Sequence, residues 1–214
     1  MLSAPMFEFI DVQQNTDEWF QLRCGKLTSS KLGTIMANYG KAFGEPAKKY
    51  AVDIALEQIK GVPTENNYSN AHMERGHEQE PIARMMYEDE TFCEVTNGGF
   101  FDLDFVGCSP DGLVLDDGLI EIKSVIGSVH FKNIKRGTVD PAYYWQCVGN
   151  LKFTERNWID FISYSSDFPE DSQLFTYRLS AADLVDDFKK IDVRISEFQS
   201  LVDDSRNIIL NANY

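Results

Sequence analysis

Cysteine is scarce in this chain, and its few positions show no pairing pattern. The four residues, Cys24, Cys93, Cys108 and Cys147, are scattered along the 214 residues and include no CxxC pair. This distribution argues against a disulfide framework and against a zinc site. It is typical of reduced thiols in a cytosolic protein.

Long apolar runs and a basic N-terminal segment are also missing. The first twelve residues, MLSAPMFEFIDV, contain no lysine or arginine, and no stretch of the chain reaches the roughly 18 apolar residues of a membrane helix. We therefore expect no secretory signal, no membrane contact and a cytoplasmic site of action, in a bacterium or, for a phage-encoded protein, in its host. The length fits one domain over residues 1–214, with a core that needs no disulfide support.

Positive charge is outnumbered, with 20 lysines and arginines against 34 acids and a net charge of −14. This balance argues against a simple nucleic-acid binder and suggests an acidic interaction protein that mimics DNA. Two windows oppose that view, because residues 19–44 and 122–139 contain no acid. Their basic side chains are Arg23, Lys26, Lys31 and Lys41, then Lys123, Lys132, Lys135 and Arg136. Phosphate contacts require such local positive charge, although solvated helix faces show the same pattern.

The segment GCSPDGLVLDDGLIEIKSV, residues 107–125, carries the strongest chemical signal. Asp111 follows a proline, and Glu121 and Lys123 stand two residues apart on an apolar stretch, so alternation places both on one face of a strand. The Asp-Asp-Gly turn at 116–118 predicts a hairpin that brings Asp111 onto the adjacent strand. Carboxylates are ligands that Mg²⁺ prefers, and a lysine beside a metal can hold or deprotonate an attacking water. A surface hairpin whose charges face water is the alternative.

The arrangement resembles the PD-(D/E)xK nuclease signature, which implies a metal-dependent enzyme that cuts nucleic acid. Two further polar residues are candidates for the same site. Glu80, in RGHEQEP, could complete the metal cage or help to bind a second ion, with Glu74 and Glu78 as rivals. Gln146, on a helix otherwise rich in aromatic and apolar residues, could bridge a lysine or water to a phosphate. An exposed helix position is the alternative for each.

Apolar spacing, caps and turns predict elements in the order helices, sheet, helix, sheet, helix. The helical pattern over residues 72–89 contains Pro81, which should distort or restart the helix near Glu80, and a polar loop should precede it at 64–70. The other helices are expected at 17–23, 28–37, 47–59, 129–135, 142–153 and about 181–202, and the strands within 92–125 and at 158–164 and 173–179. This order predicts an α/β fold with a central mixed β-sheet flanked by helices.

Four motifs extend the resemblance to a single family. TDEWFQLRCGKLTSSKLG, RGHEQEP, GCSPDGLV with IEIKS, and AYYWQ together resemble the lambda exonuclease family, also called YqaJ-type viral recombinases or alkaline exonucleases. They span residues 17–158 in order, and the C-terminal part carries no matching motif. The resemblance implies a PD-(D/E)xK restriction-endonuclease-like core and a toroidal homotrimer. It further implies processive degradation of double-stranded DNA from 5′ ends, which releases 5′ mononucleotides and leaves a 3′ single strand for a single-strand annealing protein.

The resemblance also implies roles for individual residues in catalysis. The implied metal ligands are Asp111, Glu121, the carbonyl of Ile122 and, for a second ion, Glu80. The ions would be Mg²⁺, for which Mn²⁺ could substitute. Lys123 would position or activate the attacking water, and Gln146 would steady Lys123 or that water.

A further set of residues is implied in DNA contact. Arg23 would hold the 5′ phosphate, with the hydroxyls of Thr28 and Ser30 beside it, which agrees with the first acid-free window. Met73 stands where the family uses an apolar residue to part the strands, although it could equally belong to the core. Lys26 stands at a position where the family pattern leads us to expect an apolar residue. It either adds a phosphate contact or is exposed. The second window would add Lys132, Lys135 and Arg136.

Three other classes of protein remain as alternatives. A PD-(D/E)xK endonuclease of the restriction type would cut closed circular DNA, whereas the exonuclease needs an end. An iron–sulfur nuclease would need a cluster of C-terminal cysteines, and no cysteine follows Cys147. An acidic DNA mimic is opposed by the acid-free windows and by the apolar surroundings of Asp111, Glu121 and Lys123.

Overall fold

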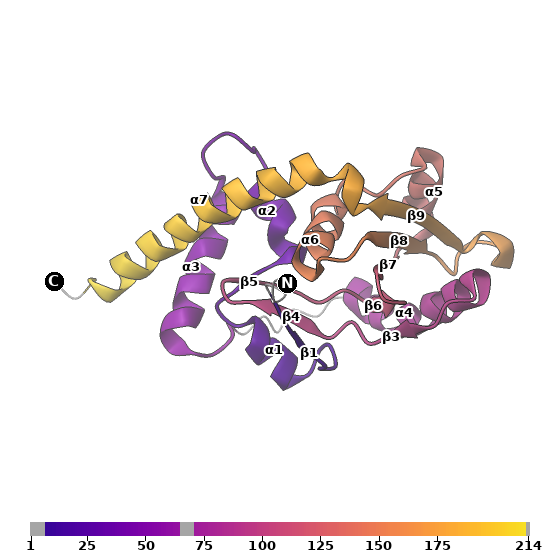
Figure 1. The fold of residues 1–214 in the computed structure, drawn as a ribbon, viewed down its shortest axis with the longest axis horizontal. Helices are drawn as coiled ribbons and strands as arrows, with labels where there is room; N and C mark the ends of the chain where they lie inside the picture. Colours follow the sequence, from indigo (N-terminus) through magenta and orange to yellow (C-terminus); the bar gives the residue numbers. More distant parts are fainter. Residues whose placement is uncertain (1–6, 65–70, 213–214) are drawn as a thin grey trace, which may run out of the picture.

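The computed structural model describes residues 7–64 and 71–212, without the side chains of residues 71–75 and 77. Helices and strands follow one another in groups along the chain, with three α-helices in succession before a run of strands (Figure 1). The helices are α1 (Asp17–Arg23), α2 (Leu32–Met36), α3 (Glu45–Lys60), α4 (Ala71–Thr91), α5 (Gly127–Arg136), α6 (Tyr144–Thr154) and α7 (Val185–Leu210), with short 3-10 helices η1 (Ser29–Lys31), η2 (Glu170–Ser172) and η3 (Ala181–Asp183). The strands are β1 (Glu8–Ile10), β2 (Leu27–Thr28), β3 (Val95–Thr96), β4 (Phe100–Leu103), β5 (Val106–Cys108), β6 (Gly112–Val114), β7 (Gly118–Ser124), β8 (Trp158–Tyr164) and β9 (Leu174–Ser180). The polar loop expected at 64–70 lies outside the described residues from residue 65 onward.

The described strands form two mixed sheets. The first has the order β1-β4-β5-β2, with β2 parallel to β5, and the second has the order β3-β6-β7-β8-β9, with β7 parallel to β8. The mixed α/β fold is thus confirmed, but the strands expected in one central sheet are divided between two. The chain passes from β5 to β6 through residues 109–111, where Pro110 has no N–H with which to continue a ladder. Asp111 therefore stands at the junction of the two sheets.

Strand β7 lies in the middle of the second sheet and packs on both faces. Leu119 belongs to the same core cluster as the buried residues of α6, and Glu121 bonds to α6 side chains. Ile120 and Ile122 point the other way, into a cluster with α4. The parallel partner β8 follows after α5 and α6, because parallel strands need a crossover connection. Glu121 is therefore inserted into an otherwise apolar interior.

Helix α7 packs along α3, α2 and α6, and its C-terminal end extends past α3 (Figure 1). It begins after a 3-10 turn and ends at Leu210, two turns beyond the expected end near Val202. The apolar spacing does continue as far as Ile209, which packs on the core. This contact explains the longer helix.

Helix α4 runs from Ala71 to Thr91 as one continuous helix, so of the two expected effects of Pro81 a restart near Glu80 is wrong and a distortion stays a prediction. Pro81 is exposed within it and removes one main-chain hydrogen bond, which costs about 3 kcal/mol in a helix interior. Ala83 and Tyr87 are fully buried against the second sheet. The packing of these side chains outweighs the lost bond and keeps the helix continuous.

Two structural findings concern hydrophobic helices and cysteines. No helix in the described ranges is both long enough and apolar enough to cross a membrane. The four cysteines are unpaired, and burial raises the pKa of the thiols of Cys108 and Cys147. These two thiols are therefore protonated and unreactive at neutral pH.

Candidate active site

A cleft of about 670 Å³ opens where the chain passes between the two sheets. All the predicted catalytic and metal-binding positions line it, namely Glu80, Asp111, Glu121, Ile122, Lys123 and Gln146. Arg23 and Ser30 line the same cleft from the first sheet side, together with Trp19 of α1. The fold therefore gathers residues that are far apart in the sequence around one cavity.

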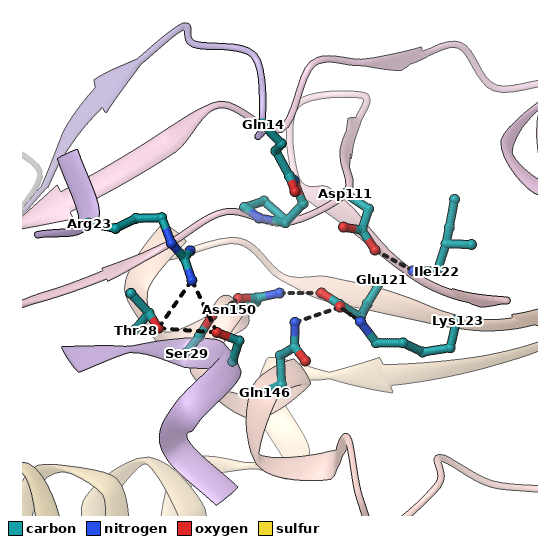
Figure 2. A network of polar contacts seen from close by, with 12 residues as sticks. Gln14, Arg23, Thr28, Ser29, Asp111, Glu121, Ile122, Lys123, Gln146 and Asn150 are labelled. Carbon is teal, nitrogen blue, oxygen red and sulfur yellow. Dashed lines mark hydrogen bonds and ion pairs between the residues drawn. The ribbon is translucent and has the colours of Figure 1, made fainter. Parts of the chain in front are cut away.

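Asp111 is held at the sheet junction by contacts to its neighbours. The Pro110 carbonyl accepts a hydrogen bond from Gln14 Nε2 at 3.1 Å, and Gly98 lies so close to that carbonyl that a Cβ would overlap it. Asp111 Oδ2 accepts a hydrogen bond from the Ile122 N–H at 2.7 Å (Figure 2). The glycine turn after β3 thus lets the chain place Asp111 against the edge of β7 beyond Ile120, where the pairing with β6 has ended.

Glu121 is fully buried, and both of its carboxylate oxygens have partners (Figure 2). Oε1 lies 2.5 Å from Lys123 Nζ and accepts from Gln146 Nε2 at 2.6 Å, while Oε2 accepts from Asn150 Nδ2 at 2.8 Å. Gln146 and Asn150 are four residues apart on α6, so both amides meet the same carboxylate. Burial, followed by repulsion from Asp111, raises the pKa of Glu121 to about 7, against the opposing effects of Lys123 and Asn150.

Lys123 shares a strand face with Glu121, as the alternation of side chains predicts, and its Nζ also lies 5.0 Å from the centre of the Tyr143 ring. Burial by itself would lower the pKa of Lys123, but Glu121 and Asp111 together raise it above its ordinary value. The lysine is therefore a cation in the metal-free site. In that state it is suited to donate hydrogen bonds to a water or phosphate oxygen.

Glu80 is the acid of the RGHEQEP motif that reaches the cleft. Glu78 is exposed and does not line the cleft, and the side chain of Glu74 lies outside the described residues. Burial, and then repulsion from Asp111, raises the pKa of Glu80 to about 8. Glu80 is thus protonated at neutral pH in the metal-free site, and a nearby cation would favour its ionised form.

The donor set at the junction fits magnesium. Among the described residues, no three histidine, cysteine, aspartate or glutamate side chains form a ready metal cluster. Mg²⁺, however, uses one or two carboxylates and completes its shell with water and substrate phosphate. Asp111 and Glu121 supply the carboxylates. The pairing of β6 with β7 ends before Ile122, and the Ile122 N–H donates to Asp111 instead. The Ile122 carbonyl points to the same edge of β7 as this N–H, so it faces the same side as Asp111.

Arg23 lies in a pocket of hydroxyl groups on the other side of the cleft (Figure 2). Its Nη2 donates to Thr28 Oγ1 and Ser30 Oγ, both at 3.4 Å, and its guanidinium stacks 4.0 Å from the centre of the Trp19 ring. No ion pair joins Arg23 to a carboxylate within the described part of the chain. Burial lowers the pKa of Arg23. A desolvated guanidinium fork beside two hydroxyls fits a phosphate group.

The remaining predicted DNA contacts whose side chains are described do not line this cleft. Lys26 Nζ is paired with Asp102 Oδ1 at 2.7 Å and donates to the Asp104 carbonyl at 2.6 Å, so a phosphate contact by Lys26 stays a prediction that would require it to leave or share these partners. This pairing with the first sheet explains the cation at a position expected to be apolar. Three basic residues are exposed on α5, where contact with DNA stays a prediction: Lys132, Lys135 and Arg136. The side chain of Met73 lies outside the described residues, so its role in parting the strands also stays a prediction.

Two residues outside the predicted set complete the site. Asn150 is fully buried and bonds to Glu121, and Ser29 Oγ donates to Asn150 Oδ1 at 2.5 Å. Asn150 has a sequence signal, because it lies four residues after Gln146 on an otherwise apolar helix. Ser29 has no local signal, because its partner is 121 residues away.

The two sheets, their helical layers and the cleft define a PD-(D/E)xK-like nuclease fold, and solved structures share it. The chain is similar to the alkaline exonuclease LHK-Exo from Laribacter hongkongensis, with 32% identity and a TM-score of 0.80 over 92% of this chain and 97% of that chain. The crystal structure of LHK-Exo in complex with dAMP matches with 33% identity and a TM-score of 0.77, covering 92% and 100% of the two chains. A phage-related exonuclease from Haemophilus somnus 129PT shares the fold at 18% identity, with a TM-score of 0.61 over 86% and 96%.

The family follows from the sequence match. Residues 18–157 match the model of the YqaJ-like viral recombinase domain. The chain therefore belongs to the YqaJ-like viral recombinase family, within the lambda exonuclease group that its motifs predicted. The comparison with curated proteins gives no significant match.

Proposed function

We propose that this protein is a magnesium-dependent exonuclease that degrades double-stranded DNA processively from its 5′ ends. The observation that carries the proposal is the meeting of Asp111, Glu121 and Lys123 in one cleft with the Arg23 pocket. One group of residues suits a metal ion and the attack on phosphorus, and the other suits a terminal phosphate. An enzyme that cuts next to an end needs both within the same cavity.

In this proposal each residue has a defined task. Asp111, Glu121 and the Ile122 carbonyl bind Mg²⁺, and Glu80 serves a second ion. Mg²⁺ would supply Lewis acidity and lower the pKa of a bound water. Lys123 orients that water through its ammonium. Gln146 donates to Glu121 at 2.6 Å and so steadies the carboxylate, a more specific task than steadying the lysine or the water.

The relatives support the proposed products of the reaction. LHK-Exo has been crystallised with dAMP, a mononucleotide of the kind that such a reaction releases. By the same family argument, we propose a homotrimer that leaves a 3′ single strand for an annealing protein, and Mn²⁺ as a substitute metal. We also propose a single domain over residues 1–214 and action in the cytoplasm.

The proposal predicts hydrolysis of linear but not of closed circular DNA. Purified protein with Mg²⁺ should release 5′ mononucleotides from a linear duplex and leave a covalently closed circle of the same sequence intact. The 5′-terminal label of an end-labelled strand should appear in mononucleotide first, before a 3′-terminal label. Cutting of the circle would instead indicate an endonuclease, and hydrolysis of neither substrate would favour the acidic DNA mimic.

The Arg23 pocket predicts a preference for phosphorylated ends. The wild type should release the first nucleotide faster from a 5′-phosphorylated duplex than from a 5′-hydroxyl duplex, because the guanidinium can bind phosphate bidentately. Arg23→Ala should remove most of this preference and shorten processive runs. The measurement is the rate of first-nucleotide release from matched duplexes.

Lys31→Ala is the matched control for this variant, because it removes an exposed cation from the same acid-free window outside the cleft. It should keep the wild-type ratio of rates. A ratio that Arg23→Ala leaves unchanged would show that the phosphate pocket lies elsewhere.

A further inference from the structure

A buried chain of polar side chains connects the Arg23 pocket with Glu121 (Figure 2). Ser29 Oγ donates to Asn150 Oδ1 at 2.5 Å, and Asn150 Nδ2 donates to Glu121 Oε2 at 2.8 Å. All three side chains are at most 2% exposed. In so desolvated a place each bond is strong, and a broken one leaves an unsatisfied polar group. The position of Ser29 and the position of the Glu121 carboxylate are therefore mechanically linked.

Ser29 stands between the two hydroxyl residues of the phosphate pocket. Thr28 and Ser30 both accept from Arg23, and their own hydroxyl oxygens are 3.1 Å apart. The chain changes from β2 to η1 after Thr28, so the side chain of Ser29 turns toward α6 while its neighbours turn toward Arg23. A phosphate that draws these hydroxyls together or apart must also move Ser29.

The packing of α6 on η1 leaves no slack to absorb such a movement. A Cβ on Gly149 would overlap the Leu32 side chain and would lie 3.2 Å from the Ser29 Cβ. Only glycine allows α6 to come this close. Asn150 is the residue after Gly149 on α6. Because a close-packed interior transmits displacement, a shift of η1 also moves Asn150.

We propose that Ser29 and Asn150 are positioning residues that couple the binding of a terminal phosphate at Arg23 to the binding of the metal ion at Glu121. The inference rests on the proposed function and describes a regulation of the same site. Such coupling is reciprocal, so the phosphate tightens metal binding and the metal tightens binding of the phosphate. The site would be fully loaded with metal only on a correctly placed 5′ end.

The test compares the magnesium requirement on two kinds of DNA end. The first-nucleotide release rate is measured against Mg²⁺ concentration on 5′-phosphorylated and 5′-hydroxyl duplexes. For the wild type, the half-saturating Mg²⁺ concentration should be about fivefold or more lower on the phosphorylated end. Ser29→Ala and Asn150→Leu should bring the ratio of the two concentrations close to one.

A second readout uses the protein without DNA. Calorimetric titration with Mg²⁺ should show an affinity at least about tenfold lower for Asn150→Leu, as expected when an outer partner of a metal ligand is removed. Excess Mg²⁺ should restore most of its cleavage rate, whereas a folding defect would not respond to metal.

Thr154→Val is the matched control, because Thr154 is a buried hydroxyl residue one turn further along α6. In the described part of the chain its hydroxyl bonds to main-chain groups, the Asn150 carbonyl and the Arg156 N–H, and to no side chain of the site. It should keep both the wild-type ratio and the wild-type Mg²⁺ affinity.

Two results would overturn the inference. The first is a wild-type half-saturating Mg²⁺ concentration that is equal on the two kinds of DNA end. The second is a difference between the two ends that persists in Asn150→Leu. These results are distinct from a failure of the proposed function. If the wild type cleaves neither duplex, the protein can be titrated with Mg²⁺ by calorimetry in the presence of each intact duplex. This titration compares the Mg²⁺ affinities on the two kinds of end directly. Equal affinities on the two ends would then refute the coupling.

Discussion

Asp111→Asn is expected to reduce magnesium-dependent hydrolysis by about 10³-fold or more, since a metal ligand contributes several kcal/mol of charge stabilisation in the transition state. Asparagine keeps the shape of the side chain and an oxygen that can accept from the Ile122 N–H, now 2.7 Å from Asp111 Oδ2. The substitution therefore removes the anionic charge with little change in packing. Nuclease rates over a range of Mg²⁺ concentrations measure the effect.

Folding should survive this substitution. Burial raises the pKa of Asp111 above its ordinary value, and the nearby Glu80 and Glu121 are destabilised by its charge in turn. A raised carboxyl pKa means that the ionised form costs stability at neutral pH, so a neutral isostere relieves that cost in the metal-free protein. The melting temperature without metal should be equal to that of the wild type or higher.

Asp116→Asn provides the control, because Asp116 is an exposed acid in the turn between β6 and β7. It should leave the nuclease rate unchanged. Near-normal turnover of Asp111→Asn in Mg²⁺ would show that the metal site has been assigned to the wrong residues.

Lys123→Met should lower catalysis by about 10²-fold or more, the size expected for the loss of a group that orients or deprotonates the attacking water. Methionine keeps the unbranched stem but removes the ammonium that lies 2.5 Å from Glu121 Oε1. Binding to DNA ends should fall much less, because Arg23 and its hydroxyl partners are untouched. Gel-shift binding in Ca²⁺ and cleavage in Mg²⁺ separate the two effects.

The comparison of binding with cleavage decides the role of Lys123. If both fall by the same factor, the lysine is a phosphate contact and the water is oriented by another group. Metal affinity gives a further check, because the ammonium beside Glu121 repels a metal ion but also favours the ionised carboxylate, whose pKa is raised to about 7 even with Lys123 present. At a pH well above that value, Mg²⁺ binding by Lys123→Met should be at least as tight as in the wild type, and at neutral pH protonation of Glu121 should weaken it.

Much of the fold could be read from local sequence. Thr16 caps α1 through a bond to the Trp19 N–H, Gly61 ends α3 in a left-handed conformation, and β8 has the expected bounds. These features depend on groups a few residues apart, so their physics is visible in a short window. The same is true of Glu121 and Lys123, which share a face because a strand alternates with period two.

Other features depend on contacts between distant segments. Pro81 argued for a break in α4, yet burial of Ala83 and Tyr87 against the second sheet keeps the helix whole. Lys26 stood in an acid-free window, yet the first sheet brings Asp102 to it. Neither partner lies near in sequence, so local propensity and local charge could not reveal the outcome.

The sequence by itself determined the family of this protein and predicted its chemistry, through the order and spacing of Asp111, Glu121 and Lys123 and the motifs around them. Only the tertiary structure decided which acid of the RGHEQEP motif faces the cleft, and only the close packing of α6 on η1 joined Ser29, Asn150 and Glu121. The reason is that hydrogen bonds in a desolvated core are selected by packing and burial. Those depend on how two sheets and a helix meet, and no local pattern encodes that geometry.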